Sequence, residues 1–187
     1  MGTAGSPLRA VFLDRDGVLN DLVDRGPEFR ALGLPVRWTA PFSRSELRIR
    51  HNVRDALWLV GEKGYRRILV TNQPDVAAGR IDADEFRLMM DEVLSLPLDD
   101  VFVCMHAPGD GCSCRKPAPG MILAACAKHG INPRRSYMVG DSESDIQAGR
   151  AAGTKTMLVS SNVYVMTAAD RRVMNFMEAA QLIPRRA

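Results

Sequence analysis

The sequence contains no apolar run of the roughly 18 residues that a membrane-spanning helix needs. Its first segment, Met1–Pro7, also lacks the basic region followed by an apolar stretch that is typical of a signal peptide. Cysteine is scarce: there are four, and three of them gather near a histidine rather than being spread as in a secreted disulfide framework. These absences predict a cytoplasmic protein without a membrane partner.

A large excess of one charge is missing as well. The 25 Lys and Arg residues stand against 22 Asp and Glu residues, so the formal net charge is only +3. No stretch interleaves aromatic with basic residues, which argues against a nucleic-acid partner. The mild positive charge suits a small anionic substrate instead. At 187 residues and 46% hydrophobic, the chain can bury one core, so we expect a single domain over 1–187, as a monomer or weak homodimer.

Short apolar or β-branched runs alternate with segments in which apolar residues recur every three or four positions. The first pattern predicts strands and the second predicts helices. This alternation predicts an α/β fold with a mostly parallel sheet that is covered on both faces. Strands are expected at 10–13, 67–70, 101–104, 137–139 and 156–159, and helices near 53–60 and 86–93, at 120–129, after Ser142 to near Gly153, and after Thr167 to before Pro184.

Residues 21–50 fit neither pattern and form an exception. They contain three prolines and six arginines. A loop of this length inside a compact domain is usually functional or disordered. Because it follows the first strand directly, we expect this segment to pass over or beside the functional site, with one or two of its arginines touching substrate.

Two aspartates, Asp14 and Asp16, follow the first predicted strand at the start of a glycine-containing loop. Open α/β sheets bind their ligands at the carboxyl ends of the strands. Two close carboxylates repel each other unless a cation or a proton lies between them. If the strand continued, Arg15 would point away from both aspartates, so we expect Lys116 rather than Arg15 to be the catalytic cation.

Three later stretches place more polar residues at the ends of strands or before a helix. Thr71, Asn72 and Gln73 end the second strand, and their hydroxyl and amide groups are good neutral ligands for phosphate oxygens. Arg115-Lys116-Pro117 supplies two cations just before a helix. Asp141 and Asp145 follow the fourth strand.

In this order, the four stretches resemble the four motifs of the haloacid dehalogenase superfamily of phosphotransferases, and the resemblance covers residues 11 to about 159. It implies a three-layer Rossmann-like fold without a large cap domain, and a phosphatase that works through an aspartyl-phosphate intermediate. Asp14 would be the nucleophile, Asp16 the general acid and base, and Thr71, Asn72 and Lys116 the groups that stabilise the transferring phosphoryl oxygens.

The resemblance also implies a magnesium site. The ion would bind an oxygen of Asp14, the main-chain carbonyl of Asp16, Asp141, the phosphate and waters, an oxygen-rich set of the kind that Mg²⁺ accepts. Asp145 has two alternative roles: it orients the water ligands of the metal, or it caps the helix after Ser142.

A second metal site is indicated by residues 104–114, which read Cys104-x-His106, a five-residue loop, and Cys112-x-Cys114. Three thiols and one imidazole are a usual ligand set for a closed, structural zinc site. Such a site would hold the loop that delivers Arg115 and Lys116. Cys126 lies outside the cluster on an apolar helix face and is expected in the core.

The phrase Cys-x-Cys-Arg-Lys-Pro resembles one branch of the superfamily, the small capless phosphatases of heptose bisphosphate and of histidinol phosphate. Residues 71–73 and Gly120-Met121 favour the heptose enzymes, which remove the 7-phosphate of D-glycero-D-manno-heptose 1,7-bisphosphate. By that pattern Arg115, Lys116 and residues 71–73 bind substrate, the Arg115 fork in a bidentate manner.

Two departures concern the substrate. Asn20–Asp24 replace the Asp-x-Gly-Tyr-like segment of the heptose enzymes, and Ser142 stands where some relatives have lysine. The short zinc loop is also compatible with a histidinol-phosphate phosphatase. A polynucleotide 3′-phosphatase and a non-catalytic zinc-binding module are further alternatives, and neither explains the whole set of motifs together with the mild charge.

Overall fold

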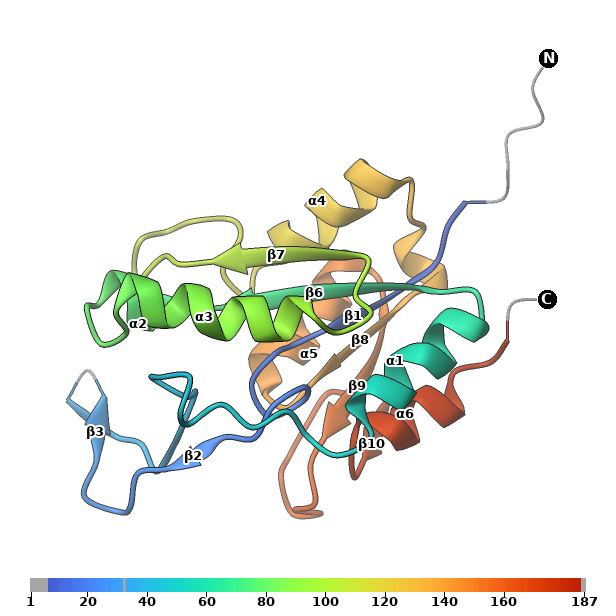
Figure 1. The fold of residues 1–187 in the computed structure, drawn as a ribbon. Helices are drawn as coiled ribbons and strands as arrows, with labels where there is room; N and C mark the ends of the chain where they lie inside the picture. The colour runs from blue at the N-terminus through green and yellow to red at the C-terminus, as the bar shows by residue number, and fades with distance from the viewer. Residues whose placement is uncertain (1–6, 32, 186–187) are drawn as a thin grey trace.

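The computed structural model describes residues 7–31 and 33–185; Met1–Ser6, part of the segment in which no signal peptide is expected, lie outside them. Its centre is a parallel six-stranded sheet with the order β10-β9-β8-β1-β6-β7 (Figure 1). The strands are β1 (Ala10–Leu13), β6 (Arg66–Asn72), β7 (Asp100–Cys104), β8 (Tyr137–Gly140), β9 (Lys155–Val159) and β10 (Arg171–Val173). The predicted α/β class and mostly parallel sheet are confirmed.

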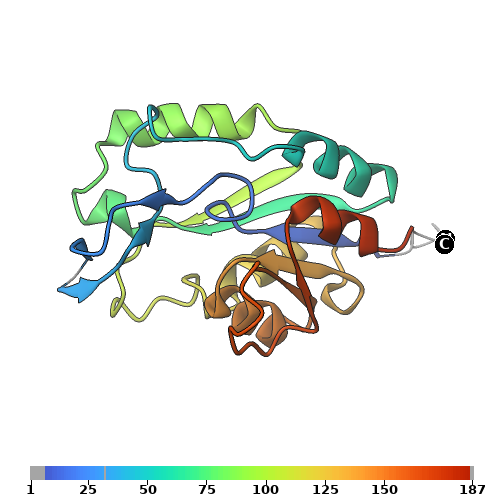
Figure 2. The same ribbon diagram turned by 90° about the horizontal axis from the view of Figure 1, so that it is seen from below.

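Helices cover both faces of this sheet and make a three-layer structure, as Figure 2 shows. In β1, Val11 and Leu13 face one core, with α1 (Val53–Glu62), α3 (Ala83–Leu94) and α6 (Phe176–Leu182). Ala10 and Phe12 face the other core, with α4 (Gly120–His129) and α5 (Glu143–Ala152). A strand buried on both faces is continuously apolar, which is why these four residues carry no polar side chain. The structure also has the short helix α2 (Pro74–Ala77) and a 3₁₀ turn at Pro133–Arg135.

Helices α4 and α5 end where the sequence predicts, each directly before a glycine. Gly130 and Gly153 follow these helices with φ of 63° and 86°. This left-handed conformation, which ends a helix, costs least in glycine. Among the described residues no helix combines the length and apolar character that crossing a bilayer requires.

The predicted last helix was wrong in its start. The chain after Thr167 forms the edge strand β10, which pairs with β9, and α6 begins only at Phe176. The side chain of Asn175 caps this helix by accepting a hydrogen bond from the backbone N–H of Glu178 at 3.0 Å. Phe176 is buried in the core, whereas Met174 remains exposed.

Residues 21–50 form two small antiparallel ribbons rather than a structureless loop. β2 (Val23–Asp24) pairs with β5 (Trp38–Thr39), and β3 (Arg30–Ala31) pairs with β4 (Leu34–Pro35). They extend from the side of the sheet toward which the arrow of β7 points (Figure 1). Strands of two residues are too short to leave a periodic pattern, and for this reason they could not be predicted from the amino-acid pattern.

Candidate active site

The candidate site is built where the chain leaves β1 and β8 at the carboxyl edge of the sheet. β1 and β8 are neighbours in the sheet, so Asp14 and Asp141 are brought to the same edge. Gly17 has a φ of 76°, and a Cβ atom there would lie 2.0 Å from Oδ2 of Asp141. Glycine is therefore needed at position 17, because any side chain would occupy the place of the Asp141 carboxylate.

Three carboxylates converge at this point. Asp14, Asp141 and Asp145 each offer an oxygen atom, and these oxygens lie within 4.8 Å of one another. Burial, followed by the Asp145 charge, raises the pKa of Asp14 to about 7. Burial, followed by the Asp14 charge, raises the pKa of Asp141 to about 8. Crowded, desolvated carboxylates of this kind bind either a proton or a cation, and an all-oxygen donor set fits Mg²⁺.

Lys116 is the positive group of the cluster, and its side chain is 2% exposed. Its Nζ lies 2.8 Å from Oδ1 of Asp14 and 2.6 Å from Oδ1 of Asp145. Burial lowers the pKa of Lys116, but the two carboxylates outweigh this effect and raise it above its ordinary value. The side chain is therefore a fixed cation beside Asp14 at neutral pH.

The two carboxylate oxygens of Asp145 contact two different residues. Oδ2 accepts hydrogen bonds from the backbone N–H of Ser142 at 3.0 Å and from the Ser142 hydroxyl at 2.6 Å, while Oδ1 pairs with Lys116. The side chain thus caps the start of α5 and also positions the lysine. Of the two predicted roles, the helix cap is the one that the geometry displays.

The three residues at the end of β6 divide into two functions. Asn72 clamps the main chain of Lys116: its Nδ2 donates to the lysine carbonyl, and its Oδ1 accepts from the lysine N–H, both at 3.0 Å. Gln73 donates from Nε2 to Oδ2 of Asp16 at 2.7 Å and to the Thr71 hydroxyl oxygen at 2.9 Å. Within the described residues the Thr71 hydroxyl donates to no acceptor, so its proton can be donated to a ligand.

The expectation that Arg15 points away from the aspartates was wrong. β1 ends at Leu13, and the backbone then turns, so the alternation of a strand no longer applies. Arg15 is completely buried, and its Nε and Nη2 donate to Oδ1 of Asp16 at 3.1 and 3.0 Å. Nδ2 of Asn20 donates to the same oxygen at 3.0 Å. Neither residue was expected as a partner of Asp16, and only their place within the first motif could have indicated them.

The predicted Cys104, His106, Cys112 and Cys114 also come together. The Sγ atoms of the three cysteines, none of them in a disulfide, are 3.2 to 3.8 Å apart, and Nδ1 of His106 lies 3.4 Å from Cys104 and 3.2 Å from Cys114. Ligand atoms around a tetrahedral Zn²⁺ with Zn–S bonds of about 2.3 Å are separated by roughly 3.8 Å. The donor set and its spacing therefore fit a single metal ion.

This Cys/His cluster is followed directly in the sequence by Arg115 and Lys116. Arg115 follows Cys114 directly, and its Nη1 donates to the His106 carbonyl at 3.1 Å. The backbone N–H of Gly120 donates to the Ser113 carbonyl at 3.0 Å, and a Cβ at Gly120 would lie 2.2 Å from that oxygen. The loop is thus packed closely against the start of α4.

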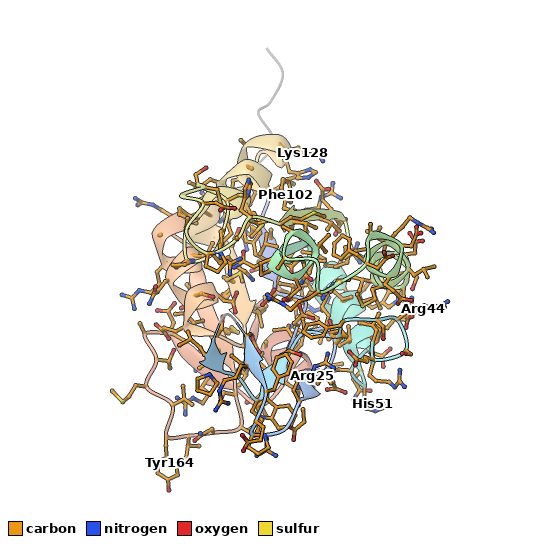
Figure 3. The ribbon with its side chains drawn as sticks, turned by 90° about the vertical axis from the view of Figure 1, so that its left-hand side faces the viewer. Arg25, Arg44, His51, Phe102, Lys128 and Tyr164 are labelled. Atoms are coloured by element: carbon orange, nitrogen blue, oxygen red, sulfur yellow. The ribbon has the colours of Figure 1, made fainter. Side chains whose placement is uncertain are left out.

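Most arginines of segment 21–50 are engaged within the protein. Arg25 pairs with Glu46, Arg37 with Asp24, and Arg44 with Glu92. Figure 3 shows Arg25 beside the small strands and Arg44 on the side of α3. Arg50 pairs with Asp21, and it also lines a cavity together with Asp141. Among the described arginines of segment 21–50, Arg50 is thus the one that lines a cavity together with Asp141.

Comparison with known proteins assigns the family. The HAD-hydrolase-like family model matches residues 113–180. The D-glycero-β-D-manno-heptose-1,7-bisphosphate 7-phosphatases of Helicobacter pylori (strain J99) and Haemophilus ducreyi are 32% and 34% identical to this chain; the alignments cover 81% and 86% of the chain and 82% and 87% of those proteins.

Solved structures agree with these relatives. The D,D-heptose 1,7-bisphosphate phosphatase of B. bronchiseptica, solved with magnesium and phosphate, superimposes with a TM-score of 0.76 at 25% identity. That match covers 93% of this chain and 97% of the other. The chain therefore belongs to the heptose-bisphosphate phosphatase family within the haloacid dehalogenase superfamily, and it is a phosphoric monoester hydrolase.

Proposed function

We propose that the protein hydrolyses the 7-phosphate of D-glycero-D-manno-heptose 1,7-bisphosphate, with Mg²⁺ as cofactor and Asp14 as the group that accepts the phosphoryl. The observation that carries this proposal is the Asp14 carboxylate, held by the buried Lys116 in a cluster with Asp141. The substrate is supported by the names of the relatives that align over more than four fifths of the chain.

The proposed reaction has two steps. In the first, an oxygen of Asp14 attacks phosphorus, the bond to the sugar oxygen breaks, and the Asp16 carboxyl gives its proton to that oxygen. In the second, Asp16 takes a proton from water, which attacks phosphorus and releases phosphate and Asp14. Arg15 and Gln73 hold the Asp16 carboxyl in place for both proton transfers.

Two groups beside Asp14 would bind the phosphoryl oxygens. The Thr71 hydroxyl would donate a hydrogen bond, and the buried Lys116 would supply a positive charge in a site shielded from water, where charge stabilisation is strong. Asn72 would act mainly by fixing the position of Lys116, since both polar atoms of its side chain contact the lysine backbone.

Magnesium would be held by Asp14, by the main-chain carbonyl of Asp16 and by Asp141. When bound, the ion offsets the negative charges that otherwise keep carboxylate and phosphate apart. Asp145 would support the site through Ser142 and Lys116 rather than as a direct ligand.

Zinc would be held by Cys104, His106, Cys112 and Cys114 in a structural role. Its four protein ligands leave no open position for a water or a substrate. The ion would fix the loop that carries Arg115, whose remaining donors would bind substrate. The expected cytoplasmic location and monomeric or weakly dimeric state stay predictions.

A substrate panel tests the proposal. Phosphate release is measured with and without Mg²⁺ on heptose 1,7-bisphosphate, histidinol phosphate and a 3′-phosphorylated oligonucleotide, for the wild type and Asp14→Asn. We expect magnesium-dependent release from the heptose, and a folded Asp14→Asn variant without turnover. Faster hydrolysis of histidinol phosphate or of the oligonucleotide would overturn the substrate, and turnover by Asp14→Asn would overturn the nucleophile.

A further inference from the structure

A cavity of about 770 Å³ opens beside the carboxylate cluster. Asp141 lines it from the site, Trp38 and Arg50 from segment 21–50, and Ser160–Asn162 from the loop after β9. Its size lies in the range of small-molecule sites. A ligand whose phosphate lay at the carboxylates would therefore have room for the rest of its body on this side.

Trp38 contributes a large aromatic side chain to the lining of this space. It is 52% exposed, although an indole gains much free energy from burial. Its strand, β5, pairs with β2, where Asp24 lies opposite Trp38. The guanidinium of Arg37 lies 5.4 Å from the centroid of the indole and pairs with Asp24 at 2.8 Å. The ring is thus held in place by its neighbours and still left uncovered.

Hydrogen bonds connect the residues next to the β2–β5 ribbon with the rest of segment 21–50. Arg25 donates to both carboxylate oxygens of Glu46 at 2.6 Å, and the backbone N–H of Phe42 donates to the same carboxylate at 2.8 Å. Such a bidentate pair restricts both side chains. The part of the cavity lining that includes Trp38 is therefore preorganised by contacts within the protein.

Arg50 adds hydrogen-bond donors to the same cavity. Its Nε donates to Oδ1 of Asp21 at 2.8 Å, and its Nη1 donates to the Gly17 carbonyl. Within the described part of the chain, Nη2 has no hydrogen-bond partner, and the side chain is 32% exposed. Two N–H groups thus remain for a ligand. The Asp21 carboxylate offsets the charge of the guanidinium, which suits hydroxyl oxygens better than a second phosphate.

We propose that this cavity binds the sugar ring of the substrate, with an apolar face of the ring on Trp38 and its hydroxyl oxygens accepting hydrogen bonds from Nη2 of Arg50. The proposal rests on the proposed phosphatase function and deepens it. An aromatic platform beside polar donors matches a ring that has both C–H faces and hydroxyl groups. Specificity for the sugar would then come from segment 21–50, separately from the residues that perform the chemistry.

The test compares two substrates in three variants. Heptose 1,7-bisphosphate fills the cavity, whereas the acetyl group of acetyl phosphate is too small to reach Trp38. We expect Trp38→Ala and Arg50→Gln to lower kcat/KM on the sugar at least tenfold relative to acetyl phosphate, mainly through KM. The matched control is Trp58→Ala, which removes an indole that is 56% exposed on α1 and not among the residues lining the cavity. An unchanged ratio in Trp38→Ala would overturn the proposal.

Failure of the proposed substrate gives a different result. If the wild type hydrolyses another sugar phosphate better than heptose bisphosphate, the substrate is wrong, and the same ratio with the better sugar tests the cavity. If the wild type hydrolyses acetyl phosphate but no sugar phosphate in the panel, the cavity does not bind a sugar ring, although the phosphatase chemistry stands.

Discussion

Replacing Asp141 by asparagine should stabilise the magnesium-free protein while abolishing its activity. Burial and the Asp14 charge raise the pKa of Asp141 from 3.8 to about 8. Folding raises the pKa of this carboxyl, so above pH 4 the carboxyl ionises easily in the unfolded chain but not in the folded protein. The free energy of unfolding therefore falls as pH rises from about 4 toward 8. For this pKa shift, the loss of unfolding free energy is about 2 kcal/mol at pH 5 and about 4 kcal/mol at pH 7. Asparagine keeps the shape and cannot ionise.

Urea unfolding of the wild type and Asp141→Asn at pH 5 and pH 7, in magnesium-free buffer, measures this difference. We expect the variant to be more stable, with the larger gain at pH 7. Added Mg²⁺ should then stabilise the wild type and leave the variant almost unchanged. Asp91→Asn is a matched control, because Asp91 is exposed on α3 and its replacement should change stability by less than about 0.5 kcal/mol. A variant that is less stable than the wild type at pH 7, or an equal difference at both pH values, would refute the reasoning.

Three further predictions concern other parts of the molecule. Cys112→Ser should lose bound zinc, stability and activity together, by metal analysis, thermal unfolding and phosphate release; full activity in zinc-free protein would contradict the structural role. Gln73→Leu should lower kcat on heptose bisphosphate by about 10- to 100-fold with little change in KM, because the general acid loses a positioning hydrogen bond; a change in KM alone would assign Gln73 to binding. Although burial raises it, hydrogen bonds from Lys128 and His129 lower the pKa of Asp100 to about 2. The Asp100 carboxylate therefore contributes its full stabilisation above about pH 4, and this contribution is lost as pH falls toward 2. Asp100→Asn should reduce the loss of unfolding free energy between pH 5 and pH 3, and an unchanged dependence of stability on acid pH would contradict this prediction.

The central sheet could be predicted from the sequence because its strands are short and apolar on both faces. Ala10–Leu13 begin and end where expected, and the other predicted strands are one to three residues longer in the structure. Parallel strands end at one edge of the sheet, which is why the pattern of strands predicts that residues as distant as Asp14 and Asp141 lie together.

The parts that the sequence did not reveal depend on side-chain contacts or on very short strands. The position of Arg15 depends on a turn that begins one residue after β1, and no periodic pattern marks such a turn. β10 is a three-residue edge strand, and its apolar residue Val173 also fits a helical pattern. The clamp of Asn72 on Lys116 joins residues 44 positions apart, which no local pattern can show.

The most direct test of the account is to identify the residue that carries the phosphoryl group. Asp16→Asn, which slows the second step, is mixed with acetyl phosphate and Mg²⁺, quenched, and reduced with borohydride, which converts an acyl phosphate to an alcohol. Mass spectrometry of the digested protein should then find homoserine in place of the aspartate at position 14. Reduction at another carboxylate, or none at position 14 while phosphate is released, would contradict the account.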